Sequence, residues 1–182
     1  LAFVLMDTHV HFVLYGGFGE CNAFLHEYIR RTSSYISEKH SAKKKFRDIE
    51  IGHQRIDDEK YLLSAICYTI KNPPSAGLRY NAWDYPWSSG SLYFRVSGNW
   101  TSPIWMSGMD NYLYSITAKR NLIRTRVQIG KDAVPMINDI VFPGEYVAVR
   151  IVEQLFGSHR SFNYFLCFTK ESDIDSRGGS VT

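Results

Sequence analysis

The chain is poor in cysteine and has no long apolar run. Its three cysteines are Cys21, Cys67 and Cys167, and this odd number without paired spacing excludes a disulfide framework and indicates a reducing compartment. No apolar stretch approaches the roughly 20 residues that span a bilayer. Residues 1–6 lack the charged start and the length of a signal peptide. We therefore expect a cytoplasmic protein without a membrane partner.

A strong charge of either sign is also missing. The net charge is only +3, so the distribution of charge says more about partners than its total. Clusters of basic residues are usually solvated surface, but in a protein that processes DNA they contact phosphates. The basic candidates for DNA contacts are Arg30, Arg31, Lys43, Lys44, Lys45 and Arg47.

His53 and Trp87 are two further candidates for DNA contacts, and each has a simpler interpretation. His53 lies shortly before a predicted helix and is either a phosphate contact or a surface polar residue. Trp87 belongs to an aromatic loop, residues 83–89, whose rings can stack on unpaired bases. The alternative, which we favour, is that these rings pack the helix against the sheet.

Apolar and aromatic residues are abundant, at 45% and 15% of the chain. They can build a sizeable core and exclude disorder over most of the sequence. From about residue 107 the pattern changes to shorter helical segments, predicted at 112–123, 145–156 and 161–168, the last with Ser158 as N-cap. We expect a domain at residues 1–106, a helical extension at 107–170 that binds a DNA hairpin stem, and a frayed tail at 171–182.

A pair of histidines lies in the first apolar run. Residues 1–15 read as one β-strand that contains His9 and His11. Successive side chains of a strand point to opposite faces, so these two imidazoles share one face. Two imidazoles held rigidly together can bind a divalent metal. A half-buried polar edge is the alternative.

The second group of polar candidates lies on a predicted helix. Apolar residues recur at three- and four-residue spacing after Asp57, which is a suitable N-cap. Pro73 disfavours the α conformation of Asn72, so we expect the helix to end there. Tyr68 and Asn72 are one turn apart and project from the same side. By themselves, Tyr68 reads as a core tyrosine and Asn72 as a helix C-cap.

Four stretches follow one another within the first 95 residues: Phe3–Phe12, Ile56–Leu62, Tyr68–Leu78 and Asp84–Ser89. In order and spacing they resemble the single-tyrosine HUH transposases, most closely the branch of REP-associated tyrosine transposases. The resemblance implies an α+β fold of the HUH-endonuclease type, ferredoxin-like, with a mostly antiparallel sheet and packed helices.

The resemblance also implies a chemistry, which is the cutting and rejoining of single-stranded or hairpin DNA. Tyr68 would be the nucleophile that forms a 5′-phosphotyrosine link. His9, His11 and Asn72 would hold Mg²⁺ or Mn²⁺, which polarises the phosphodiester. Because the link conserves the bond energy, a 3′-OH can reseal the strand without ATP.

The start of the chain departs from the family pattern. Members carry a further strand and helix before the His-x-His strand, whereas Leu1 opens directly on that strand. A central strand without a neighbour exposes backbone hydrogen-bonding groups. The position beside it is therefore filled by another part of the chain, filled by a second molecule, or left open. A homodimer is therefore one prediction. The alternative function is a truncated, inactive transposase derivative that still binds DNA.

Asp7 to His11 after an apolar strand also resembles the first metal motif of amidohydrolase barrels. Those enzymes take further metal ligands from later strands of a barrel of about 250 residues or more. The 182 residues here are too few for such a barrel, and the other histidines do not end successive apolar strands. A metal-dependent amidohydrolase is therefore the remote alternative.

Overall fold

The computed structural model describes residues 1–39, 49–94, 136–137, 140–141 and 146–170. Strands β1 (Ala2–Leu5) and β2 (Val10–Val13) form an antiparallel hairpin. It is followed by helices α1 (Phe18–Lys39) and α2 (Glu59–Ser75) and by a short 3-10 helix, η1 (Gly90–Leu92).

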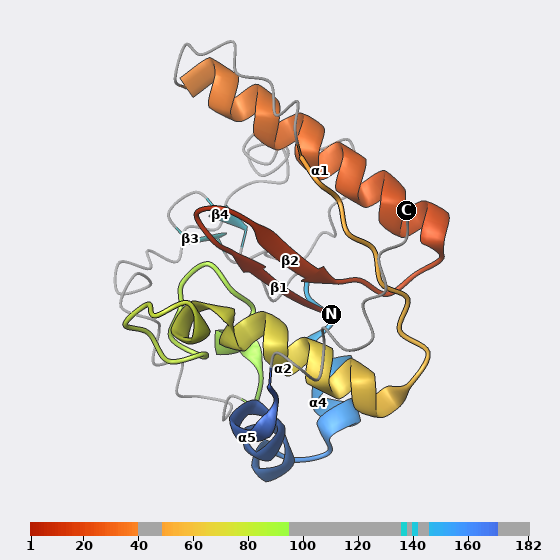
Figure 1. Cartoon of the computed structure of the whole chain (residues 1–182), viewed down its shortest axis with the longest axis vertical. Coiled ribbons are helices and arrows are strands. Elements are labelled where there is room, and N and C mark those ends of the chain that lie inside the picture. Colours follow the sequence, from red (N-terminus) through yellow and green to blue (C-terminus); the bar gives the residue numbers. More distant parts are fainter. Residues whose placement is uncertain (40–48, 95–135, 138–139, 142–145, 171–182) are drawn as a thin grey trace.

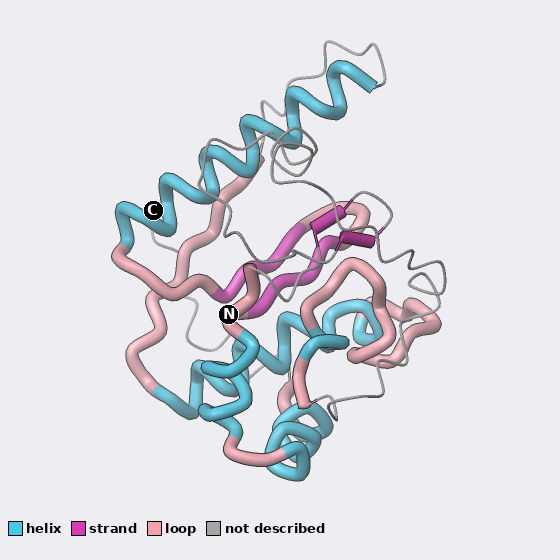
Figure 2. The backbone as a smooth tube through the Cα atoms, turned by 180° about the vertical axis from the view of Figure 1, so that it is seen from behind, coloured by secondary structure: helices cyan, strands magenta, loops and turns pink. Residues whose placement is uncertain are grey.

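The later part of the chain adds a small hairpin and two helices. Strands β3 (Met136–Ile137) and β4 (Ile140–Val141) pair antiparallel, and helices α4 (Val149–Phe156) and α5 (His159–Phe168) follow. Helices α2, α4 and α5 gather on one side of the β1–β2 hairpin, and α1 lies on the other side (Figures 1 and 2). The protein is therefore α+β, as the sequence predicts.

The first apolar run folds back on itself, so the prediction of a single strand over residues 1–15 is wrong. The N–H of Met6 donates to the carbonyl of His9 at 2.9 Å and closes a turn between β1 and β2. The turn contains Asp7 and Thr8, whose short polar side chains favour such a conformation. A strand thus precedes the one that carries His11, and the expectation that Leu1 opens directly on the His-x-His strand is also wrong.

The other edge of β1 is covered by the segment Trp87–Ser89. The N–H of Leu5 donates to the carbonyl of Trp87 at 2.8 Å, and the N–H of Ser89 donates to the carbonyl of Phe3 at 3.0 Å. Strand β1 is therefore flanked on both sides, by β2 and by a strand-like segment more than 80 residues later. Another part of the chain thus fills the position beside β1, whereas the predicted gap concerned the strand that carries the histidines, and the described partner of that strand, β2, is β1.

Helix α2 differs from its prediction at both ends. Its N-cap is Asp58 rather than Asp57, because the Asp58 carboxylate accepts from the N–H groups of Lys60 and Tyr61. The helix continues through both prolines to Ser75 instead of ending at Asn72. Proline only biases the preceding residue away from helix, and here the buried ring of Pro73 packs in the last turn. The N–H of Ala76 then donates to the carbonyl of Asn72 and closes the helix at 2.9 Å.

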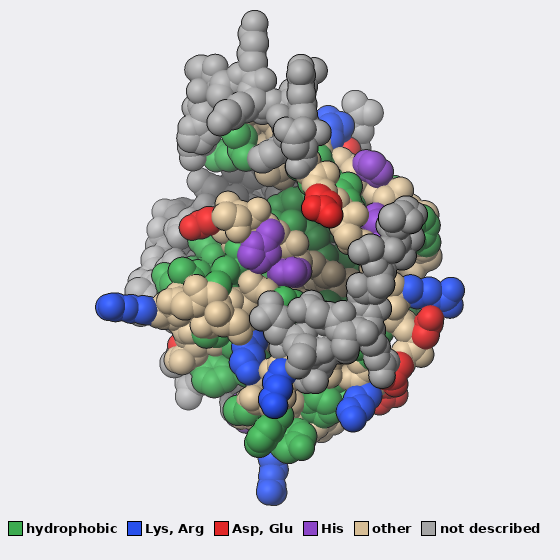
Figure 3. Space-filling view, in the orientation of Figure 1, with side chains coloured by type: hydrophobic (Ala, Val, Ile, Leu, Met, Phe, Trp, Pro, Cys, Tyr) green, Lys and Arg blue, Asp and Glu red, His purple; other side chains and the backbone are tan. Residues whose placement is uncertain are grey.

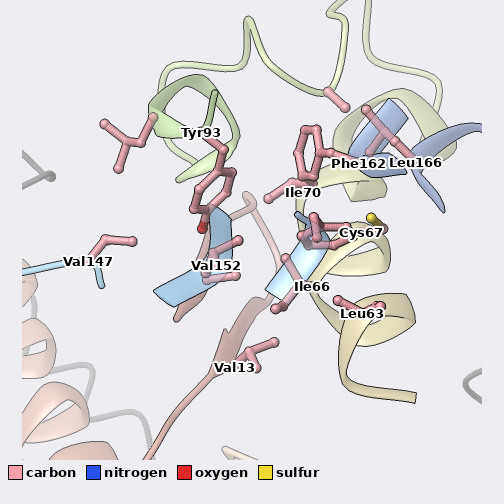
Figure 4. Close-up of a cluster of buried hydrophobic side chains, with 14 residues drawn as sticks. Val13, Leu63, Ile66, Cys67, Ile70, Tyr93, Val147, Val152, Phe162 and Leu166 are labelled. Carbon is pink, nitrogen blue, oxygen red and sulfur yellow. The ribbon is translucent and has the colours of Figure 1, made fainter. Parts of the chain in front are cut away.

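One hydrophobic core joins α2, the hairpin and the C-terminal helices (Figure 4). Ile66 and Ile70 on α2 and Val152 on α4 have no exposed surface. Cys67 is equally buried, and burial raises the pKa of its thiol to about 12, so it stays protonated and serves packing. The other members of this core include Val13, Leu63, Tyr93, Phe156, Phe162 and Leu166.

Two helices predicted for the extension are confirmed. Helices α4 and α5 end where the sequence predicts, although α4 begins at Val149 rather than at residue 145 and α5 at His159 rather than at residue 161. The Ser158 hydroxyl caps α5 by accepting from the N–H of Ser161 at 3.1 Å. Gly157 ends α4 in the left-handed conformation, with φ of 69°. The predicted helix at 112–123, the boundary near residue 106 and the tail at 171–182 lie outside the described residues. No helix in the described ranges is long and apolar enough to cross a membrane.

Candidate metal and tyrosine site

The β1–β2 hairpin positions both histidines toward α2. His11 lies opposite Val4, and directly opposed residues of an antiparallel pair share one face. Val4 is fully buried on the side where β1 packs against α2. His9 lies two residues before His11, and the centroids of the two imidazole rings are 4.9 Å apart. The expected sharing of one face therefore holds, although His9 belongs to the turn rather than to a strand.

Helix α2 supplies the other two side chains of the site. The ring centroid of Tyr68 lies 5.6 Å from that of His11. One turn later, Oδ1 of Asn72 lies 3.2 Å from Nε2 of His9, although the two residues are 63 positions apart in the sequence. The structure thus brings together the four residues that the sequence pattern singled out for metal binding and nucleophilic attack.

The site lies at the boundary between core and solvent. Asn72 is buried with 8% of its surface exposed, His11 and Tyr68 are partly buried, and His9 is exposed. Figure 3 shows histidine side chains side by side near the centre of this face. Burial lowers the pKa of His11, and the positive charge of His9 lowers that pKa further. The neutral imidazole, which is the form that binds a metal ion, is therefore favoured at His11.

The donor atoms at this position fit a small divalent cation. An octahedral ion with bonds of about 2.1 Å separates neighbouring ligand atoms by about 3 Å, and the 3.2 Å between His9 Nε2 and Asn72 Oδ1 matches that spacing. Nowhere in the described residues do three or more His, Cys, Asp or Glu side chains form a metal-binding group. A metal here would thus depend on two imidazoles and one amide oxygen, and further ligands would come from water or from a DNA phosphate.

Two neighbours of the site were not predicted from the sequence. The hydroxyl Oγ1 of Thr8 lies 2.9 Å from Nδ1 of His9, on the side of the ring away from Asn72. Lys71, next to Asn72, donates from Nζ to the carbonyl oxygens of Cys167 and Thr169 near the end of α5. The hydroxyl directly before His9 was a usable sequence signal, whereas the partners of Lys71 lie too far along the chain for a local pattern to reveal them.

The arginine pair predicted to contact DNA lies on α1. Both side chains are exposed and bind the same carboxylate: Arg30 reaches both oxygens of Glu27 at 2.7 and 2.8 Å, and Arg31 reaches one at 2.6 Å. Their hydrogen bonds, Arg30 first, lower the pKa of Glu27 to about 2. The single carboxylate thus orients both arginines and offsets half of their combined positive charge. Lys43, Lys44, Lys45 and Arg47 lie outside the described residues.

The remaining DNA candidates are both at the surface. His53 is exposed, and its ring centroid lies 5.6 Å from that of Phe18 at the start of α1. Trp87 exposes 54% of its surface, while its backbone is held against Leu5 of β1. In the same loop Tyr85 is buried and donates from its hydroxyl to the carbonyl of Leu5 at 2.9 Å. The loop therefore combines a packed ring with exposed ones.

Comparisons of the chain with protein-family models, with curated proteins and with solved structures find no match.

Proposed function

We propose that the protein is a metal-dependent, tyrosine-nucleophile DNA transposase of the HUH type that acts on single-stranded or hairpin DNA. The observation that carries the proposal is the approach of Tyr68 and Asn72 on α2 to His11 and His9 at the β1–β2 hairpin. A core tyrosine and a helix cap need no such pair of imidazoles beside them. The resemblance of the four sequence stretches supports the same conclusion.

The proposed cofactor is Mg²⁺ or Mn²⁺, held by His9 Nε2, Asn72 Oδ1 and the His11 ring. When bound, this ion withdraws electron density from a phosphodiester oxygen and so makes the phosphorus easier to attack. The lowered pKa of His11 keeps its imidazole neutral for this task. Asn72 would supply a neutral oxygen ligand, and its side chain is 8% exposed on α2 with Oδ1 beside His9 Nε2.

Tyr68 supplies the nucleophile in this proposal. Its phenol loses a proton, and the oxygen attacks phosphorus in line with the leaving 3′-oxygen. The new bond is a 5′-phosphotyrosine ester, and the bond from phosphorus to the 3′-oxygen breaks, so that this oxygen leaves as a 3′-OH after it gains a proton. Attack by another 3′-OH on the ester runs the same step backwards and frees Tyr68.

The described structure offers little support for the remote amidohydrolase alternative. Strands β1 and β2 pair antiparallel, whereas an amidohydrolase barrel is built from parallel strands. The alternative of an inactive, DNA-binding derivative shares the same scaffold, so only covalent chemistry separates it from the transposase.

The deciding experiment is a search for a covalent adduct. The probe is a pool of single strands in which a short hairpin is flanked by randomised segments, with one label at the 3′ end and a different label at the 5′ end. With Mn²⁺, the 3′ label should migrate with the protein on a denaturing gel, and the 5′ label should be released on a shorter strand. EDTA should abolish both products.

Matched variants identify the nucleophile. Tyr68→Phe keeps the ring but removes the oxygen, so the adduct should vanish while the circular dichroism spectrum is retained. Tyr61→Phe, two turns earlier on the same helix, should still form the adduct. An adduct that persists in Tyr68→Phe rejects the assignment of Tyr68. DNA binding without any adduct in the parent protein rejects the enzyme and favours the inactive derivative.

A further inference from the structure

The side chain of Thr8 contacts the nitrogen of His9 that faces away from Asn72. Its Oγ1 lies 2.9 Å from His9 Nδ1, while His9 Nε2 lies 3.2 Å from Asn72 Oδ1. Both ring nitrogens of this exposed histidine are therefore occupied, each by a neutral oxygen group. The turn that closes with the N–H of Met6 on the carbonyl of His9 holds Thr8 in this position.

In the neutral form of His9, the two contacts favour one position for the proton. An amide oxygen only accepts hydrogen bonds, so the contact with Asn72 places the proton on Nε2, and Nδ1 then accepts from the Thr8 hydroxyl. A metal ion at Nε2 requires the opposite tautomer, with the proton on Nδ1. A hydroxyl can donate in the first state and accept in the second by rotating about its C–O bond.

We propose that Thr8 is a positioning residue that serves both tautomers of His9 and holds the one in which Nε2 binds the metal. This inference rests on the proposed metal site. Thr8 does not touch the ion; it accepts the hydrogen bond from Nδ1–H, which orients the ring and makes Nε2 a better ligand. Because the hydroxyl satisfies Nδ1 in either state, loading the site needs no rearrangement of the backbone turn.

The chemistry of the side chain predicts which replacements are tolerated. Thr8→Ser keeps the hydroxyl and should behave like the parent. Thr8→Val keeps the branched shape but has no polar atom, so it removes only the contact with Nδ1. The contact is exposed, and water can replace it in part, so we expect a loss of Mn²⁺ affinity near the lower end of the roughly 10- to 100-fold range for such outer partners.

The test uses the full chain and metal alone. Electron paramagnetic resonance of free Mn²⁺ gives the affinity of the parent, Thr8→Ser and Thr8→Val. The ¹⁵N shifts of labelled histidine, recorded with and without excess Mg²⁺, give the tautomer of His9, and the signals of His26, which is exposed on α1, serve as the internal control. The parent and Thr8→Ser should switch from Nε2–H to Nδ1–H on loading, and Thr8→Val should show a weaker affinity and mixed tautomers.

The outcomes distinguish the role of Thr8 from the existence of the metal site. If the parent binds Mn²⁺ and Thr8→Val matches it in affinity and tautomer, the role of Thr8 is overturned while the metal site stands. If Thr8→Ser loses as much affinity as Thr8→Val, the hydroxyl alone is not sufficient to hold His9, and the proposal is again overturned. If the parent does not bind Mn²⁺ or Mg²⁺ with or without single-stranded DNA, the proposed metal site itself fails.

Discussion

The ammonium group of Lys71 donates a hydrogen bond to the carbonyl oxygen of Thr169 at 3.2 Å. A second bond, to the carbonyl of Cys167 at 3.4 Å, comes from the same nitrogen. The last carbonyls of a helix lack partners within it, and a cation at this end also interacts favourably with the helix dipole. These two hydrogen bonds link α2, the helix that carries Tyr68 and Asn72, to the C-terminal end of α5.

Replacement of Lys71 by methionine should weaken this attachment. Lys71→Met keeps the aliphatic stem but removes the donor, and we expect the free energy of unfolding to fall by about 1 kcal/mol, the usual net contribution of such hydrogen bonds. Urea denaturation measures the change. Lys60→Met, at the first turn of the same helix, is the control and should change stability by less than about 0.5 kcal/mol. Equal effects of the two substitutions would contradict a specific role for Lys71.

The C-terminal helices should unfold together with the hairpin and α2. Phe162 on α5 is 3% exposed and belongs to the shared core, with its ring centroid 5.7 Å from that of Tyr93. Phe162→Ala should therefore lower the free energy of unfolding by about 3–5 kcal/mol. Tyr164→Ala on the same helix, at a position 60% exposed, should have a much smaller effect. Separate unfolding transitions for near- and far-ultraviolet circular dichroism would argue against one cooperative core.

Removal of the proposed amide ligand should lower metal affinity without unfolding the protein. Asn72→Ala deletes Oδ1, which lies 3.2 Å from His9 Nε2, and it leaves the helical backbone intact. The affinity for Mn²⁺ in the presence of single-stranded DNA should fall by at least the roughly 10-fold that the loss of an outer partner costs. Calorimetry measures it, and His9→Ala combined with His11→Ala should abolish binding. Unchanged binding in the double variant would exclude this metal site.

His11 should make the protein less stable as the solution becomes acidic. Its folded pKa lies below the 6.5 of an unperturbed histidine, mainly because of burial and then because of the charge of His9. Below pH 6.5 the unfolded chain binds more protons than the folded protein, so stability is complete above this pH and declines as the pH falls toward the folded pKa.

Urea denaturation across this pH range measures the effect in the metal-free protein. His11→Gln should flatten the decline, whereas His26→Gln, at an exposed position on α1, should leave the slope as it is in the parent. A slope that is the same in all three proteins would show that His11 is not the group responsible.

Local periodicity explains which parts of the site the sequence could predict. The shared face of His9 and His11 follows from the two-residue repeat of extended chain, and the common side of Tyr68 and Asn72 follows from the helical turn. Neither repeat depends on the rest of the protein. The turn at residues 6–9 was missed because the apolar pattern continues across it, with only Asp7 and Thr8 as a short polar break.

Tertiary packing explains what local patterns could not show. Pro73 and Pro74 lie within the last turn of α2, where burial of Pro73 outweighs the steric bias against helix. The segment Trp87–Ser89 pairs with β1 although nothing in its own sequence marks it as a strand. The attachment of α5 to Lys71 likewise joins residues almost 100 positions apart.

The separation of the two halves of the site has a consequence for folding kinetics. The β1–β2 hairpin and helix α2 each contain only local contacts, which form within microseconds. His9 and Asn72, 63 positions apart in the sequence, meet only after the loop between them closes, and contacts of this range are made late. In the proposed transposase the metal site would therefore form when α2 docks on the hairpin. The rate of Mn²⁺ uptake during refolding would then report the rate of this docking.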